Sequence, residues 1–301
     1  MLKISIIMPI YNALKDVKIC LNSLLENFDF STGEIILIDD YSFDETKVYL
    51  EEFVKNNVDK FTLFRNDENL GFIKTSNRGM KLANGEIIIL LNSDTKIPKN
   101  FSKYIIDCFD SDKNIGIASP LRSGSGGYSI EMPKHYNLEK MNEHIRRIHK
   151  PIYPIVAYCE GLCFCIRRNV IEKLGYLDEV YGLGYHEEID YSFNAIKHGI
   201  KCVLIDNLYI YHKNFASFGS KKRKKQIKKN DKIFNERWIG FREKINEQYE
   251  FRNYANIIEK EMFPTRKLIK TLYSKEKIGN RVIHHVCGIR ISHKKHYELI
   301  T

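Results

Sequence analysis

The 301-residue sequence contains no hydrophobic run approaching the roughly 20 apolar residues that a membrane-spanning helix needs. Its start, Met1 to Ser5, leads straight into a strand-like run, without the charged, apolar and small-residue segments of a signal peptide. Seven cysteines form an odd number with no visible pairing framework, which favours a reducing compartment. These absences predict a cytoplasmic protein that is at most peripheral to the inner face of a membrane.

Signatures of several binding classes are also missing. Cys159, Cys163 and Cys165 lack the Cys-x-x-Cys spacing and the second pair of a zinc ribbon, so we expect small buried residues. The glycine-rich stretch 123–127 fits no phosphate-loop spacing and predicts a mobile loop. The net charge of +10 and the pI of about 9.1 indicate an anionic partner, but no aromatic or fold signature indicates nucleic acid.

What the sequence does contain is a run of five apolar residues, Ile87 to Leu91, that leads into the polar triplet Asn92-Ser93-Asp94. The run predicts a strand buried on both faces of a parallel sheet. Ligands of such sheets bind beyond the carboxyl ends of the strands, so the triplet lies where a site is expected. Asp94 is a hard oxygen ligand suited to Mg²⁺ or Mn²⁺, although a polar turn capped by Asp94 is the simpler interpretation.

Three further strand and helix pairs precede this run. Apolar segments at 3–8, 34–38 and 61–64 alternate with amphipathic helices at about 17–28, 42–55 and 72–83. This alternation predicts parallel strands with right-handed crossovers, which brings all four carboxyl ends to one edge. The polar clusters 9–12, 39–40, 66–69 and 92–94 are therefore predicted to meet there, and together they indicate a site more strongly than any one cluster does.

Two adjacent acids, Glu187 and Glu188, follow a glycine-punctuated loop at the predicted start of a helix. Carboxylates there gain about 0.3–1 kcal/mol from the helix dipole, so capping is a sufficient structural reason for them. The functional interpretation is a general base, because deprotonating an alcohol needs a nearby carboxylate whose pKa burial or a like charge has raised. His212 ends a later strand and joins a metal site only if that strand runs toward Asp94.

Ordered motifs extend from about Ile4 to Gly219, most of the chain. They comprise a strand and P-x-Y-N turn at 6–12, D-D-x-S-x-D-x-T at 39–46, N-x-G at 69–71 and 77–79, A-x-G-E at 83–86, Asn-Ser-Asp at 92–94, E-E-x-D at 187–190 and H-x-x-x-x-S-F-G at 212–219. Their order and spacing resemble family 2 of the glycosyltransferases, whose GT-A fold is an α/β, Rossmann-like and mostly parallel sheet flanked by helices. Asn92, in the first place of the family's metal-binding D-x-D, resembles the branch of rhamnosyl- and galactofuranosyl-type transferases.

The resemblance implies an inverting transferase that moves a hexosyl or deoxyhexosyl group from a UDP- or dTDP-sugar to a hydroxyl of a glycan or lipid-linked acceptor, in cell-surface polysaccharide or glycoconjugate synthesis. Glu188 matches the base position, with Glu187 as a rival. Asp94 would hold Mn²⁺ or Mg²⁺ on the diphosphate with help from His212, while the uncharged Asn92 leaves the strictness of the metal requirement open. The residues implied to bind the nucleotide sugar are Pro9, Tyr11, Asn12, Asp39, Asp40, Asn69, Gly71, Asn77, Asn92, Ser93 and Asp190.

The same resemblance divides the chain into a transferase domain over 1–219 and an extension over 220–301. Within the domain, 1–119 is the implied nucleotide-binding half, and 120–219 is the acceptor and catalytic half with a flexible insertion at 121–154. The extension is predicted to be helical and basic, with seven basic residues and no acid from Lys221 to Lys229. Its helices are predicted to hold an anionic membrane surface or to pair two subunits as a homodimer.

Two alternatives stay open. A nucleotidyltransferase has a similar sheet but needs a glycine-rich triphosphate loop with Lys or Arg after the first strand, and residues 9–12 are not such a loop. A non-catalytic protein that binds nucleotide sugars or glycans would use the basic extension. The intact acidic and histidine positions argue against that second alternative.

Overall fold

The computed structural model describes residues 3–124, 127–213, 220–243, 253–262, 273–278, 281–286 and 289–294. The chain divides into two compact units, Met1–Ala255 and Asn256–Thr301. The boundary predicted at residue 219 therefore falls inside the first unit. The physical reason is that the helix after this point packs against the loop before Glu187, as described below.

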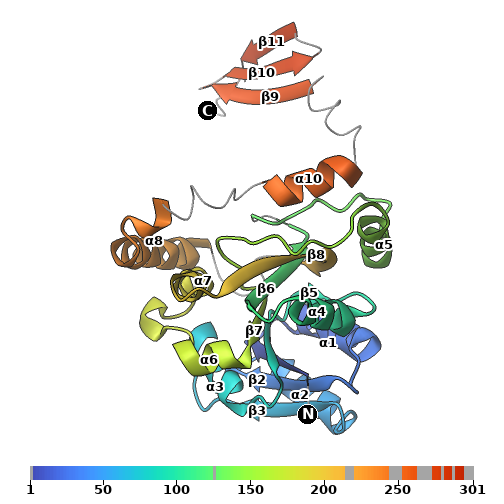
Figure 1. Ribbon diagram of the computed structural model, residues 1–301, viewed down its shortest axis with the longest axis vertical. Helices are drawn as coiled ribbons and strands as arrows, with labels where there is room; N and C mark the ends of the chain where they lie inside the picture. Colours follow the sequence, from blue (N-terminus) through green and yellow to red (C-terminus); the bar gives the residue numbers. More distant parts are fainter. Residues whose placement is uncertain are drawn as a thin grey trace, which may run out of the picture. The chain divides into compact units, whose positions relative to one another are not determined.

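An eight-stranded sheet forms the first unit, in the order β3-β2-β1-β4-β7-β6-β8-β5 (Figure 1). Strands β1 to β4 pair in parallel, which confirms the prediction from the sequence. β7 is antiparallel to β4 and β6, β8 is parallel to β6, and the short β5 is antiparallel to β8. The strands are β1 (Ile4–Ile10), β2 (Gly33–Asp39), β3 (Phe61–Arg65), β4 (Ile87–Leu91), β5 (Thr95–Lys96), β6 (Ile115–Arg122), β7 (Cys163–Arg167) and β8 (Lys201–His212).

Helices cover the faces of this sheet (Figure 1). Helix α3 approaches β1 closely, because a Cβ atom on Gly79 would lie only 2.2 Å from Cγ2 of Ile7. The helices of the first unit are α1 (Leu14–Asn27), α2 (Thr46–Lys55), α3 (Phe72–Leu82), α4 (Phe101–Ser111), α5 (Leu138–Ile148), α6 (Arg168–Leu174), the short 3₁₀ helix η1 (Glu179–Tyr181), α7 (Glu187–Lys197) and α8 (Ser220–Arg237).

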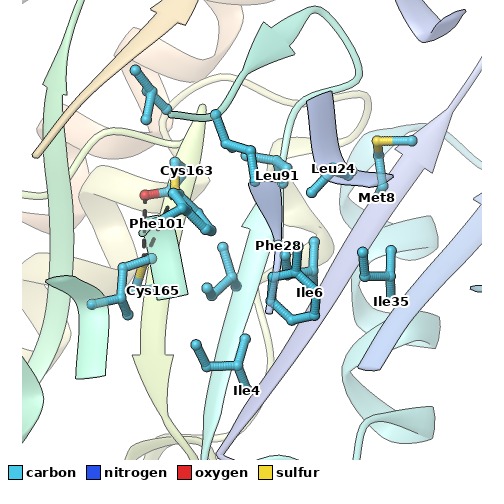
Figure 2. Packing of buried hydrophobic residues seen from close by; sticks show 14 of the residues in the cluster. Ile4, Ile6, Met8, Leu24, Phe28, Ile35, Leu91, Phe101, Cys163 and Cys165 are labelled. Carbon is cyan, nitrogen blue, oxygen red and sulfur yellow. Dashed lines mark hydrogen bonds between the residues drawn. The ribbon is translucent and has the colours of Figure 1, made fainter. Parts of the chain in front are cut away.

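The main core lies between the sheet and helices α1, α2 and α4 (Figure 2). Alternate residues of β1 point into it, while Ile7 points to the opposite face and contacts α3. The strand is therefore buried on both faces, as its continuous apolar run predicts. Cys163 and Cys165 are fully buried in the same core, as expected of small apolar residues. Core residues from β1 and α1 include Ile4, Ile6, Met8, Leu24 and Phe28.

The insertion at 121–154 begins as a continuation of β6 and contains α5. Asn142 of α5 is fully buried and fastens this helix to β8. Its side-chain amide donates to the carbonyl of Tyr209 at 2.8 Å and accepts from the backbone N–H of Tyr209 at 2.9 Å. The insertion is thus anchored to the sheet, and residues 125 and 126 of its glycine-rich stretch lie outside the described residues.

The extension is only partly helical, which corrects the prediction of a wholly helical tail. It contains α8 and α10 (Asn253–Met262) and then an antiparallel sheet of β9 (Tyr273–Ile278), β10 (Arg281–Val286) and β11 (Ile289–Lys294). Within the residues that the structure describes, no helix is long and apolar enough to span a bilayer.

Candidate functional site

Asp40, at the end of β2, holds together three of the predicted polar clusters. Its backbone N–H donates to the carbonyl of Ile10 at 2.7 Å. Its buried carboxylate accepts hydrogen bonds from the side chain of Asn66 at 2.7 Å and from the backbone N–H groups of Leu70 and Gly71 at 2.8 and 2.9 Å. Asp40 therefore brings the loop after β3 to the ends of β1 and β2, as parallel pairing predicts.

The end of β1 is joined to the turn after β2 through Asn12. The backbone N–H of Asn12 donates to Oγ of Ser42 at 2.8 Å, and its side-chain oxygen accepts from the N–H of Phe43 at 3.0 Å. Tyr11 meets the Phe43 ring edge-on, with 6.0 Å between ring centroids. Phe43 keeps 77% of its surface exposed, so an aromatic face of the kind that stacks on nucleobases lies at this strand end.

Other predicted residues at this edge have structural partners. Pro9 is buried within β1, one residue before its end. Asp39 is buried and accepts hydrogen bonds from Arg65 and from the backbone N–H of Ser42. The side chain of Asn69 donates to the carbonyl of Asp40 at 3.3 Å. These contacts fix the shape of the edge.

The metal pair expected from the sequence does come together. β5 pairs with β8 so that Thr95 lies opposite His212, which brings the histidine beside Asp94. Oδ1 of Asp94 is 3.0 Å from Nε2 of His212, and the two side chains are only 8% and 12% exposed. Asn92 lies next to the same imidazole, with 3.5 Å between Nδ2 and Nε2, and Ser93 lies in the intervening turn.

These two side chains fit a divalent cation. Ligand atoms about 3.0 Å apart match neighbouring positions of an octahedral ion with bonds of about 2.1 Å. In the part of the chain that the structure describes, no cluster of three or more His, Cys, Asp or Glu surrounds a single point. A pair is nevertheless the usual protein contribution to a cation that also binds substrate phosphates and water.

A buried ion pair that the sequence did not reveal lies directly behind His212. The guanidinium of Arg122 places NH1 3.1 Å from Nδ1 of His212 and pairs through Nε with the carboxylate of Glu160. This contact orients the imidazole so that Nε2 faces Asp94. The sequence gives only a weak signal for this pair. Arg122 and Glu160 are each a charged residue at the end of an otherwise largely apolar stretch.

Glu188, at the start of α7, lies near Glu160. Its carboxyl carbon is 3.5 Å from where a Cβ on Gly161 would be, next to Glu160. Burial raises the pKa of Glu188 to about 7, and the charge of Glu160 adds to the rise. Burial, and then the charge of Glu188, raise the pKa of Glu187 well above its usual range. Among the described residues, Oε2 of each glutamate has no hydrogen-bond partner, so each can still accept a proton or a hydrogen bond.

Two predicted donor-binding residues lie elsewhere. Asn77 is buried on α3, where its side chain exchanges hydrogen bonds with the backbone of Leu177 at 2.9 and 3.0 Å. The carboxylate of Asp190 accepts from Tyr181, Arg237 and Trp238. Both residues therefore fasten the segments around α7, and the structure does not bring them to the strand ends. The motif residues 217–219 lie outside the described residues.

Solved structures with the same architecture are glycosyltransferases. The crystal structure of GalNAc-T7 with UDP, GalNAc and Mn²⁺ aligns with a TM-score of 0.58 at 17% identity, over 95% of this chain and 65% of that one. The crystal structure of S. aureus TarS 1-349 in complex with UDP-GlcNAc aligns with a TM-score of 0.54 at 15% identity, over 98% and 99%. These likenesses confirm the α/β fold of GT-A type that the motifs implied.

Sequence comparisons point the same way. The family model of Glycosyl transferase family 2 matches residues 5–175. Poly-beta-1,6-N-acetyl-D-glucosamine synthase of Staphylococcus epidermidis is 33% identical over 113 residues, which are 38% of this chain and 27% of that protein. N-acetylgalactosaminyltransferase 7 of Drosophila melanogaster is 27% identical over 233 residues, which cover 68% of this chain and 39% of that protein. The chain thus spans less than half the length of these relatives.

Proposed function

Because the chain belongs to glycosyl transferase family 2, we propose that it transfers a hexosyl or deoxyhexosyl group from a nucleotide-diphosphate sugar to a hydroxyl of an acceptor. One observation supports this most strongly. A series of side-chain contacts links the Asp94–His212 pair through Arg122 to Glu160, and the buried carboxyl of Glu188 lies close enough for the charge of Glu160 to raise its pKa. This arrangement connects a candidate cation site to a candidate base beyond the ends of the parallel strands, where ligands of α/β sheets bind.

Glu188 is the proposed general base. With a pKa raised to about 7, it accepts a proton from an acceptor hydroxyl at neutral pH more readily than an ordinary carboxylate does. The deprotonated oxygen then attacks the anomeric carbon in line with the departing diphosphate, and a single displacement inverts that centre. Mn²⁺ or Mg²⁺ held by Asp94 and His212 would neutralise charge on the diphosphate. Glu187 remains the rival base.

The proposed donor is a UDP- or dTDP-sugar, bound beside Asn12, Asp40 and Phe43. Relatives solved with UDP or UDP-GlcNAc support a uridine nucleotide. The proposed acceptor is a glycan or lipid-linked saccharide in cell-surface polysaccharide or glycoconjugate synthesis, which the name of the S. epidermidis relative supports. A place in the rhamnosyltransferase-like branch rests on Asn92 alone.

Release of nucleoside diphosphate tests this function. The full chain would be incubated with Mn²⁺, a panel of UDP-, dTDP- and GDP-sugars, and glycan and polyprenyl-linked acceptors. Acceptor-dependent release from one donor class is the expected result. Donor binding without release under any of these conditions would instead indicate a non-catalytic binding protein, and pyrophosphate release from a nucleoside triphosphate and a sugar phosphate would indicate a nucleotidyltransferase.

The pH dependence of transfer follows from the environment of Glu188. A base must be ionised, so kcat/KM should rise with pH and level off above a midpoint near 7. The negative charge of Glu160 raises the pKa of Glu188, and Glu160→Gln removes it while leaving the positive charge of Arg122. Loss of the nearby negative charge, with the positive charge of Arg122 retained, favours the ionised form of Glu188. The midpoint of the pH profile should therefore shift to lower pH. An unchanged or upward-shifted midpoint would remove Glu160 from this role.

We also propose that the outer face of α8 binds an anionic membrane surface, or pairs two subunits. Lys224, Lys225, Lys228 and Lys229 are exposed there, and a lysine near such a surface contributes about 1 kcal/mol. Replacing all four with alanine should lower binding to phosphatidylglycerol vesicles at least tenfold, with phosphatidylcholine vesicles as the control. Sedimentation of the same variant tests the homodimer. Unchanged vesicle binding and an unchanged oligomeric state would exclude both roles for this face.

A further inference from the structure

The loop immediately before Glu187 and Glu188 has an unusual backbone. Tyr185 and His186 have positive φ angles of 74° and 81°, in the left-handed region that non-glycine residues rarely occupy. Gly182 and Gly184 are also left-handed, with φ angles of 67° and 127°. Such conformations cost of order 1–3 kcal/mol per non-glycine residue and persist only where surrounding contacts enforce them. Something must therefore hold this loop at the start of α7.

The contacts that hold the loop come from α8. Asn230 is fully buried on α8, and its side-chain Nδ2 lies 2.8 to 2.9 Å from three carbonyl oxygens of the loop. Those oxygens belong to Tyr181, Gly184 and Tyr185. Gln226, one helical turn earlier, donates to the carbonyl of Tyr181 at 2.7 Å. Asp231, which follows Asn230 in the sequence, contacts His186 of the loop, with 3.0 Å between Oδ1 and Nε2.

The same loop reaches the turn that Asp40 holds. A Cβ on Gly71 would lie 2.8 Å from a methyl carbon of Leu183 and 3.3 Å from its Cα, so loop and turn pack directly together. A Cβ on Gly184 would lie 3.9 Å from Oε1 of Glu187. The loop therefore spans from the nucleotide edge to the acidic pair, and a shift of its backbone would move the start of α7.

We propose that Asn230 is a positioning residue for sugar transfer, which sets the carboxyl of Glu188 by donating hydrogen bonds to the strained loop at residues 181–186. The inference rests on the proposed role of Glu188 as base. On this proposal α8 contributes to sugar transfer, although it begins after the last motif of the family pattern, at residues 212–219. Displacing a reacting group by about 1 Å costs up to about 100-fold in rate, so modest movement at α7 suffices.

Asn230→Asp is the sharpest variant, because it keeps the shape of the side chain and replaces its donor with an oxygen that repels the three carbonyls. We expect kcat to fall about 10- to 100-fold, while KM for the donor changes less than about threefold. Hydrogen exchange at the amides of 182–190 should accelerate. Glu236→Ala, at an exposed position on the same helix, should change none of these quantities.

If Asn230→Asp does not fold, Gln226→Ala removes one hydrogen bond to the same loop and should give a smaller loss with the same split between kcat and KM. Wild-type kcat and wild-type exchange at 182–190 in the variant that folds would overturn the proposal, and so would a loss expressed only in KM. Failure of the proposed function is a separate result. If Glu188→Gln retains full activity, Glu188 is not the base, whatever the exchange data show.

Discussion

Glu188→Gln is expected to lower the rate of sugar transfer about 10²- to 10⁴-fold, the range that a general base contributes. Glutamine keeps the size and hydrogen-bonding shape of the side chain but cannot take a proton from the acceptor hydroxyl. Donor binding should be nearly unchanged, because Glu188 lies on α7 and the proposed donor contacts are at Asn12, Asp40 and Phe43. Parallel assays of Glu187→Gln decide between the two acids, and a fully active Glu188→Gln enzyme would remove Glu188 from the mechanism.

The same variant should be more stable than the wild type at alkaline pH. The pKa of Glu188 is raised in the folded state, from an ordinary value near 4.5 to about 7. A group with a raised folded pKa is neutral in both states at low pH and loses stability as pH rises through the folded value. Glutamine stays neutral throughout, so the free energy of unfolding at pH 8 should rise by about 1–3 kcal/mol. Urea unfolding at pH 4 and pH 8 measures this gain, which should be nearly absent at pH 4, below the ordinary value of 4.5, and fully present above about 7.

Asp94→Asn is expected to lower kcat/KM about 10²- to 10³-fold in the presence of Mn²⁺. The substitution preserves shape but removes the one carboxylate of the Asp94–His212 pair, and a bound cation contributes several kcal/mol toward neutralising a leaving diphosphate. The dependence of the rate on Mn²⁺ concentration should shift to much higher concentrations.

Asp59→Asn provides a matched control for this substitution, because Asp59 is an exposed carboxylate in the turn before β3, at the opposite end of that strand from the site. It should leave both the rate and the Mn²⁺ dependence unchanged. Equal activity of Asp94→Asn and the wild type at every Mn²⁺ concentration would show that transfer does not use a cation at this pair.

The first half of the sheet could be predicted because local patterns determine it. Continuous apolar runs separated by amphipathic helices allow parallel strands with right-handed crossovers, and that topology brings the polar strand ends to one edge. The sequence predicted the Asp94–His212 pair only on the condition that the strand ending at His212 runs toward Asp94. No local sequence pattern determines the direction of β8 in the sheet. The antiparallel pairing of β5 with β8 decided it.

Other parts of the site depend on contacts between distant segments. Arg122 and Glu160 are 38 residues apart, and their pairing depends on how the insertion returns to the sheet. The family motif at 187–190 implies that Asp190 binds the nucleotide sugar, on the same helix as Glu188. At about 100° per residue, however, two positions along a helix lie roughly 200° apart, so Asp190 faces α8 instead. The contacts of α8 with the loop at residues 181–186 could not be predicted from its basic composition, because the lysines lie on the exposed face of the helix.

We propose that this edge binds a nucleotide sugar through a cation held at Asp94 and His212. Thermal unfolding of the whole chain with UDP-, dTDP- and GDP-sugars, each with and without Mn²⁺, tests it most directly, because a ligand that binds only the folded state raises the melting temperature by mass action. We expect a rise with one nucleotide class that requires Mn²⁺ and disappears in Asp94→Asn. A rise that is independent of Mn²⁺ and survives Asp94→Asn, or no rise with any donor, would contradict it.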